Sequence, residues 1–259
     1  MSNTSEFEIR KEQTITDSIT HFMIDWLSDD IRIFSTDLDD IRIVQKASSK
    51  FPEGRLFHTD IKSDELRIVD GRKETIKIGF LFHRSLLEVY LPVKVWNSVR
   101  ITTVGGGVYF NDISAVNCKC RITSGRAEIS GHFKDLDLGI VGSSVTGENL
   151  IVDKLHINST SSKLELSGDF LEIDSHNKGR GMTVRSGVVP EKISSVGTGA
   201  KVIISIPNND GFVFKFKKLS GNFKSDFPLI SEGKQYTYLH ARRCYSAEVR
   251  GGEFSLRKQ

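Results

Sequence analysis

The chain has 259 residues, of which 38% are apolar and 27% are charged, and its net charge is +3. This length is enough to bury a hydrophobic core, and the composition excludes a disordered chain. The longest apolar runs, residues 78–82 and 86–96, fall well short of the roughly 20 residues that a membrane-spanning helix needs, and the charge is too small to indicate nucleic-acid binding.

The first residues of the chain carry no export signal of the standard kind. Residues 1–13 are polar and lack the apolar stretch and the small-residue cleavage site of a signal peptide. We therefore expect a flexible segment over residues 1–18 and a cytoplasmic location by default. Association with the cell surface through a non-standard export route is the alternative.

Residues 19–90 have the pattern of short strands. An acidic residue, an aliphatic residue, arginine and a second aliphatic residue follow one another at 30–33, 40–43 and 65–68. Because side chains alternate between the two faces of a strand, each copy places two aliphatic side chains inward and its arginine outward. The Ser-, Thr- and Asp-rich link at 35–40 supplies a turn. The pattern predicts an N-terminal β-strand entry segment over this stretch.

From about residue 91 onward, alternating strand segments are joined by corners rich in Thr, Ser and Gly. The clearest copies are residues 99–110 and 120–129, whose central glycines, Gly106 and Gly125, are 19 residues apart. A near-constant step with irregular corners is typical of stacked coils, because only the strands are tied to their neighbours. Later corners follow at steps of 17 to 22 residues, at Ser144, Ser162, Gly179, Gly199 and Gly221.

We therefore predict an all-β fold in which residues 91–259 form a parallel β-solenoid of short coils of about 18–20 residues, within one domain spanning 1–259. Such a coil buries about five or six apolar side chains at about 2 kcal/mol each, whereas ordering it costs about 1.5 kcal/mol per residue. A lone coil cannot fold and must share its core with its neighbours. An irregular β-sandwich is the alternative fold. The predicted inward pairs are Val99/Ile101, Cys120/Ile122, Leu138/Ile140, Leu155/Ile157, Leu171/Ile173 and Val202/Ile204.

Several segments together match the pattern of a known family. They are the corners at 122–125 and 219–221, the entry strand at 90–92 and the closing strand at 245–256. On these segments the chain resembles the bacterial putative adhesin family, a β-solenoid domain of unknown function found in envelope-stress and cell-surface proteins. The resemblance covers residues 19–257. It implies a bacterial source, an adhesive or scaffolding role and association with the cell envelope.

The chain also departs from that family pattern. The corners at 142–147 and 175–181 lack the Ser-Gly pair, and residues 226–240 form an insertion that is richer in aromatic residues. The family has no established catalytic residues that could be carried over. The resemblance therefore implies a non-enzymatic binding or scaffolding module, with an unknown protein or cell-envelope polymer as its partner. Self-association through the solenoid ends is a further expectation.

No residue of the chain is assigned to catalysis, to a cofactor or to a metal. Asp174, Ser175 and His176 are the residue types of nucleophilic catalysis, but adjacent residues do not easily adopt the chained geometry of a triad. Asp135 and Asp137 share the outward face of a strand, where two carboxylates could serve a polysaccharide lyase or hydrolase built on a solenoid. A carbohydrate-active enzyme is therefore the alternative function.

Two of the three cysteines lie close together. In a strand, Cys118 and Cys120 point inward with Ile122, while Lys119 and Arg121 point outward. A Cys-x-Cys pair can bind a metal or undergo redox chemistry, but no other cysteine or histidine falls at ligand spacing nearby. We interpret both cysteines as small buried core residues.

Three further sets of residues have both a purely structural and a functional interpretation. The glycines at 105–107 are typical of a tight turn, because the helix and the Lys-Ser/Thr pair of a phosphate loop are missing. Five aspartates could bind Ca²⁺, although the glycine and glutamate of an EF-hand loop are missing: Asp29, Asp30, Asp37, Asp39 and Asp40. The basic residues that gather late predict a solvated face, with an anionic phospholipid or teichoic-acid-like polymer as the alternative partner: Lys217, Lys218, Lys224, Arg242, Arg243, Arg250, Arg257 and Lys258.

Overall fold

The computed structural model describes residues 7–75, 84–233 and 235–259 and confirms the all-β prediction. The apolar run at 78–82 lies outside these residues. Within them, the helices are a 3-10 turn, η1 (Glu53–Arg55), and a single turn of α-helix, α1 (Arg72–Thr75). The strands are β1 (Glu8–Ile15), β2 (His21–Trp26), β3 (Asp30–Thr36), β4 (Ile41–Ala47), β5 (His58–Lys62), β6 (Glu65–Val69), β7 (Ser85–Pro92), β8 (Val95–Thr103), β9 (Gly106–Asn111), β10 (Ile113–Thr123), β11 (Gly125–Val141), β12 (Ser144–Thr160), β13 (Lys163–Lys178), β14 (Gly181–Ser186), β15 (Lys192–Ile206), β16 (Gly211–Ser225), β17 (Ile230–Glu232), β18 (Gln235–Leu239) and β19 (Arg243–Lys258).

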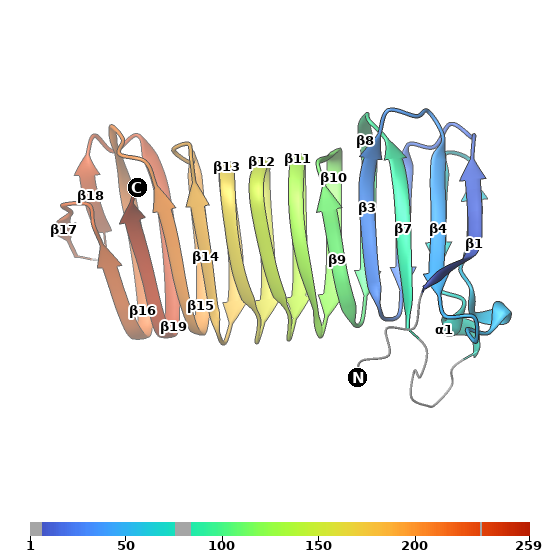
Figure 1. Cartoon of the computed structure of the whole chain (residues 1–259). Helices are drawn as coiled ribbons and strands as arrows, with labels where there is room; N and C mark the ends of the chain where they lie inside the picture. The colour runs from blue at the N-terminus through green and yellow to red at the C-terminus, as the bar shows by residue number, and fades with distance from the viewer. Residues whose placement is uncertain (1–6, 76–83, 234) are drawn as a thin grey trace.

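The strands stack in parallel as the two faces of a solenoid (Figure 1). Face 1 contains β6, β2, β8, β10, the second halves of β11, β12 and β13, and the first halves of β15, β19 and β16. Face 2 contains β7, β3, β9, the first halves of β11, β12 and β13, then β14 and the second halves of β15, β19 and β16. The long strands bend from one face to the other.

The coil repeat that the sequence predicts is present in the strand register. On face 2, Val108 lies opposite Ala127, which lies opposite Val145, and the row continues through Leu164 and Met182. Each of these neighbours is 18 or 19 residues from the last, and Val202 follows 20 residues after Met182. This step confirms the predicted coil length.

Two coils lie out of chain order, one at each end of the stack. The coil formed by β2 and β3 lies between the coil of β6 and β7 and the coil of β8 and β9. At the other end, β19 lies between β15 and β16 (Figure 1). The parallel stack therefore includes strands of the predicted entry segment, and it begins earlier in the chain than residue 91.

The predicted inward residues are buried, with one error. Eleven of the twelve are buried, but Leu171 is 44% exposed, and its neighbour Phe170 points inward instead. The strict alternation is interrupted in the middle of β13, so that Phe170 and Ile173, three residues apart, both point inward, opposite Val152 and Leu155. The predicted inward pairs also do not all lie in one row along the stack. Val202 belongs to face 2 and pairs there with β14, so it does not continue the row of inward residues on face 1.

The corners between the faces use the small polar residues that the sequence places there. Each corner that joins one coil to the next contains a residue with a left-handed backbone φ: Ser124, Gly142, Ser161, Gly179 and Gly199. The buried hydroxyl of Ser143 accepts a hydrogen bond from the Gly125 N–H at 3.1 Å, and Ser162 does the same for Ser143 at 3.1 Å. The serine corners thus satisfy backbone donors where the strand ladder is interrupted.

Antiparallel strands are added at both ends of the stack. At the N-terminal end, β4 pairs with β7, β1 pairs with β4, and β5 pairs with β6. Part of the segment expected to be flexible, residues 1–18, is therefore a strand, because β1 pairs with β4 over its whole length. At the C-terminal end, β18 pairs with β16 and β17 pairs with β18. These last two strands are the insertion at 226–240.

Candidate functional site

The two carboxylates considered for catalysis lie on the outer surface of face 1, as predicted. Asp137 accepts two hydrogen bonds from the Arg121 guanidinium, at 2.9 and 2.6 Å, and Lys119 lies 3.5 Å away. Partial burial acts to raise the pKa of Asp137, but the hydrogen bonds and charges of Arg121 and Lys119 outweigh it and lower that pKa. Asp137 is therefore a charged partner in a surface ion pair, which does not suit a general acid at neutral pH.

Asp135 belongs to a row of alternating charges on the same face. It lies opposite Lys154, which lies opposite Glu172, which in turn lies opposite Lys192. Opposite charges on neighbouring strands are a favourable cross-strand arrangement. This row, which we call the charge ladder, gives Asp135 a structural role in the face.

The residues of the considered triad are held apart by the strand itself. Asp174 and His176 point outward from β13, whereas Ser175 is fully buried and bonds the hydroxyl of Ser195 at 3.0 Å. The outward carboxylate of Asp174 instead lies 3.7 Å from His156 on the neighbouring strand. The serine hydroxyl and the histidine ring are on opposite sides of the sheet, so they cannot act together.

Cys118 and Cys120 are buried side by side in the core, with their Sγ atoms 4.0 Å apart. The hydrogen bond with Cys120 and burial raise the pKa of the Cys118 thiol well above its usual value. A thiol held neutral is a poor nucleophile and a poor metal ligand. The prediction that both cysteines are core residues is confirmed.

The five aspartates considered for calcium fall into two groups. Asp29 and Asp30 lie at the start of β3, and the other three follow the end of that strand. A strand of seven residues spans about 23 Å, so the five carboxylates cannot share one ion. Across the described part of the chain, no three His, Cys, Asp or Glu side chains converge as a metal site.

Most of the late basic residues are paired with acids on the surface. The ion pairs are Lys217–Glu248, Lys224–Glu253, Arg242–Asp210, Arg243–Asp210, Arg250–Glu248 and Arg257–Asp226. Charge compensation of this kind favours the solvated face over a surface built for an anionic polymer.

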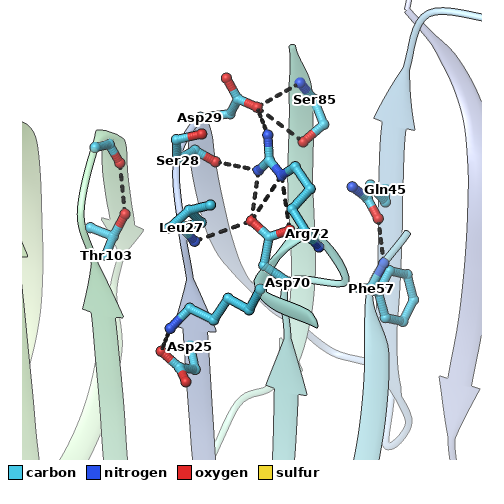
Figure 2. Close-up of polar contacts among 12 residues, drawn as sticks. Asp25, Leu27, Ser28, Asp29, Gln45, Phe57, Asp70, Arg72, Ser85 and Thr103 are labelled. Carbon is cyan, nitrogen blue, oxygen red and sulfur yellow. Dashed lines mark hydrogen bonds and ion pairs between the residues drawn. The ribbon is translucent and has the colours of Figure 1, made fainter. Parts of the chain in front are cut away.

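A buried charge network that the sequence did not predict lies at the N-terminal end (Figure 2). The Arg72 guanidinium, 1% exposed, donates hydrogen bonds to the fully buried Asp70 at 2.7 to 3.1 Å and to Asp29 at 2.6 Å. It also donates to the Ser28 carbonyl at 2.7 Å. Burial acts to lower the pKa of Arg72, but the two aspartates outweigh it and raise that pKa. No sequence pattern joins Asp29 to a residue 43 positions away.

A cavity of about 430 Å³ lies on the solvent side of this network. Its lining includes three arginines, Arg32, Arg84 and Arg126, together with Asp29 and Asp30. We call this cavity the arginine pocket. Arg126 lies 3.5 Å from Asp30, whereas neither of the other two arginines has a carboxylate at ion-pairing distance among the described residues.

The glycines at 105–107 allow the backbone to approach this pocket closely. Gly106 has a φ of +80°, and a Cβ on it would lie 2.1 Å from the carbonyl oxygen of Asp29. A Cβ on Gly107 would lie 2.6 Å from the ring of Tyr109, which therefore rests against the glycine. The interpretation of this stretch as a tight turn agrees with the structure.

Three solved structures resemble the chain over nearly its full length. A putative adhesin from Bacteroides fragilis is 13% identical, with a TM-score of 0.50, and the match covers 96% of this chain and 98% of that one. A putative cell adhesion protein from Clostridium sporogenes is 13% identical, covers 96% and 99%, and has a TM-score of 0.25. A putative adhesin from Parabacteroides merdae is 8% identical, covers 95% and 95%, and has a TM-score of 0.45. No protein-family model and no curated protein sequence matches the chain.

The Bacteroides structure confirms the predicted resemblance at the level of the fold. At 13% identity, a common fold does not carry a common function. Among the residues that the structure describes, no helix has the length and apolar character needed to cross a bilayer.

Proposed function

We propose that the chain is a non-enzymatic binding module that presents the outer faces of its solenoid to a partner at the bacterial envelope. The observation that carries this proposal is the in-register surface of face 1, on which the charge ladder runs across four successive strands. Extended surfaces of this kind are how repeat proteins bind their partners. The adhesin names of the structural neighbours are in keeping with a binding role.

The carbohydrate-active enzyme is supported less well. Its best carboxylate, Asp137, is occupied by Arg121, and the charge ladder accounts for Asp135. A pair of catalytic carboxylates needs one group that is protonated and one that is ionised at the working pH. With its lowered pKa, Asp137 cannot supply the protonated group of such a pair.

Binding can be tested with the purified chain immobilised on a biosensor surface. The probes are peptidoglycan fragments, teichoic acid, an acidic polysaccharide and vesicles containing phosphatidylglycerol. We expect saturable binding of at least one probe. Replacing Lys154 and Lys192 by Glu makes the charge ladder uniformly negative, which should weaken binding of an anionic partner to face 1.

The matched control replaces Lys163, an exposed lysine of face 2, by Glu. This variant should bind like the parent chain if face 1 is the contact surface. Release of reducing ends from any polysaccharide probe, abolished by Asp135→Asn with Asp137→Asn, would contradict the proposal and establish the enzyme instead. Fractionation of the source cells would decide between a cytoplasmic location and the envelope.

A further inference from the structure

The arginine pocket combines a rigid base with unpaired positive charge. Its base is the buried network in which Asp29 accepts hydrogen bonds from Arg72 at 2.6 Å and from the Ser85 backbone N–H at 2.9 Å (Figure 2). Asp30 accepts a hydrogen bond from the Gly107 N–H at 2.8 Å. Both aspartates are therefore held in place by the protein, which pre-organises this side of the pocket.

A single aromatic ring holds two of the three arginines. The guanidinium carbons of Arg32 and Arg126 lie 5.9 and 5.7 Å from the centre of the Tyr109 ring. Contact with the ring restricts a long side chain that would otherwise be mobile. Arg126 donates to Asp30 at 3.5 Å. Arg84 enters the lining from the segment just before β7.

The charge of the lining selects the charge of a ligand. Three arginines and two aspartates give a net charge of +1, which suits a monoanion better than a dianion such as phosphate. Guanidinium groups bind carboxylates through two parallel hydrogen bonds. The aspartate oxygens and the exposed side of Ser28 can in turn bond hydroxyl groups, and a volume of about 430 Å³ is in the range of small-molecule sites.

From this combination of charge, donors and size, we propose that the arginine pocket binds the carboxylate-bearing unit of an acidic saccharide. The carboxylate lies between Arg32 and Arg84, and the sugar hydroxyls face Asp30 and Ser28. The inference rests on the proposed function, because it names the chemistry of a partner for the same binding module. The proposed saccharide contact lies at a corner of face 2, whereas the charge ladder lies on face 1.

Isothermal titration calorimetry with sodium glucuronate tests the assignment directly. We expect glucuronate to bind and glucose, acetate and inorganic phosphate to bind at least about tenfold more weakly, because each lacks either the carboxylate, the hydroxyls or the single charge. Arg32→Gln with Arg84→Gln should weaken glucuronate binding at least about tenfold. Both side chains are exposed, so the double variant should keep the unfolding midpoint of the parent chain.

The matched control is Arg100→Gln, which removes an equally exposed arginine from face 1. It should bind glucuronate like the parent chain. Phosphate binding as tight as glucuronate binding, or glucuronate binding that the double variant leaves unchanged, would overturn the assignment. If the immobilised chain captures a polymer but does not bind glucuronate, this inference is wrong and the proposed function still holds. If it binds glucuronate but captures no envelope probe, the result supports the pocket and counts against the proposed function.

Discussion

The two ends of the solenoid bury different kinds of side chain. At the N-terminal end, apolar side chains of β1 and β4 join the core. The buried Asp70–Arg72 pair lies in the segment between β6 and β7, and its guanidinium is 5.8 and 5.9 Å from the ring centres of Trp26 and Phe51. At the C-terminal end, aromatic rings of the terminal coil pack against one another. The comparison shows that apolar packing is supplemented by a buried ion pair at one end of the repeat array and by stacked aromatic rings at the other.

The aromatic cap is built from the terminal coil and the insertion at 226–240. Phe214 stacks on Phe223 with ring centres 4.6 Å apart, and Tyr236 of β18 meets Phe223 at 5.4 Å. Phe212 contacts Phe227 at 5.3 Å in the same way. The aromatic richness that marks the insertion in the sequence therefore corresponds to its capping role.

The ends also differ in how completely they cover the two faces. The N-terminal end adds antiparallel strands to both faces, whereas β18 and β17 extend face 1 alone. Within the described residues, nothing pairs with the outer edge of β16 over 216–225. This edge carries Lys217, Lys218 and Lys224 and two register shifts around Ser220, which are features that discourage pairing with another sheet.

The largest expected effect is the loss of the buried cation. Arg72→Met leaves Asp70 charged and without its partner in the core, which should lower the free energy of unfolding by about 3–5 kcal/mol. Urea unfolding monitored by tryptophan fluorescence measures this change, because both tryptophans, Trp26 and Trp96, are buried near the N-terminal end.

The control for this variant is Arg67→Met on β6, which removes a half-exposed arginine paired with Asp25 at 3.1 Å. Surface ion pairs contribute about 0–1 kcal/mol, so the control should unfold close to the parent chain. Equal losses for both variants would show that the buried network does not hold the N-terminal end.

Truncation of the aromatic cap is expected to have the next largest effect. Phe223→Ala removes a half-buried ring from contact with Phe214, Phe216 and Tyr236, and it should cost about 2–3 kcal/mol. Circular dichroism during urea unfolding measures the loss, with Phe223→Leu as the control that keeps most of the apolar volume. A loss confined to the alanine variant supports an apolar cap, and no loss in either would contradict it.

Acid should affect the C-terminal end before the N-terminal end. Four carboxylates of the C-terminal end, Asp210, Asp226, Glu248 and Glu253, have pKa values lowered by hydrogen bonds from arginine and lysine partners. A lowered folded-state pKa gives stability that is present above the unfolded pKa of about 4 and is lost as the pH falls through the folded value. The described part of the N-terminal end has one carboxylate with a lowered pKa, Asp64, and the main cause is a hydrogen bond from the Thr20 hydroxyl.

Lowering the pH from 7 to about 3 should therefore expose the tyrosines of the C-terminal end before it changes the tryptophan emission of the N-terminal end. Tyrosine absorbance and tryptophan fluorescence, recorded on one sample, provide the two readings. Simultaneous changes in both signals would show that the ends do not differ in their response to acid.

The sequence predicts the coils better than it predicts the ends. The strand period and the Gly and Ser corners are local signals, so the coil length and all but one inward residue can be derived from them. The prediction that Leu171 points inward is wrong, because apolar residues at both 170 and 171 leave open which of the two side chains points inward. The rung partners could not be predicted, since corners of variable length shift the register between coils.

The arginine pocket and the buried network could not be predicted because they depend on contacts between distant segments. Arg72 meets Asp29 across 43 positions, and the two lie together only because the coil of β2 and β3 stacks directly on the coil of β6 and β7. No local sequence pattern predicts that a coil is stacked out of chain order. The sequence did contain one signal near the pocket, the glycines at 105–107, which mark a close approach of two backbones.

The smallest effect on stability is expected at the unpaired edge of β16, where the measured quantity is self-association of the chain. Lys218→Val with Lys224→Val should leave the unfolding midpoint within about 0.5 kcal/mol of the parent chain, because both side chains are exposed. It should nonetheless raise self-association, since lysine on an edge strand opposes pairing with a second sheet. Sedimentation velocity over a range of concentrations measures the change.

The matched control, Lys119→Val, lies on β10, which is paired on both sides, and should sediment like the parent chain. An edge double variant that also sediments like the parent would mean that the bulges around Ser220 blunt this edge without help from the lysines, and the C-terminal end would then be closed by backbone shape as well as by aromatic packing.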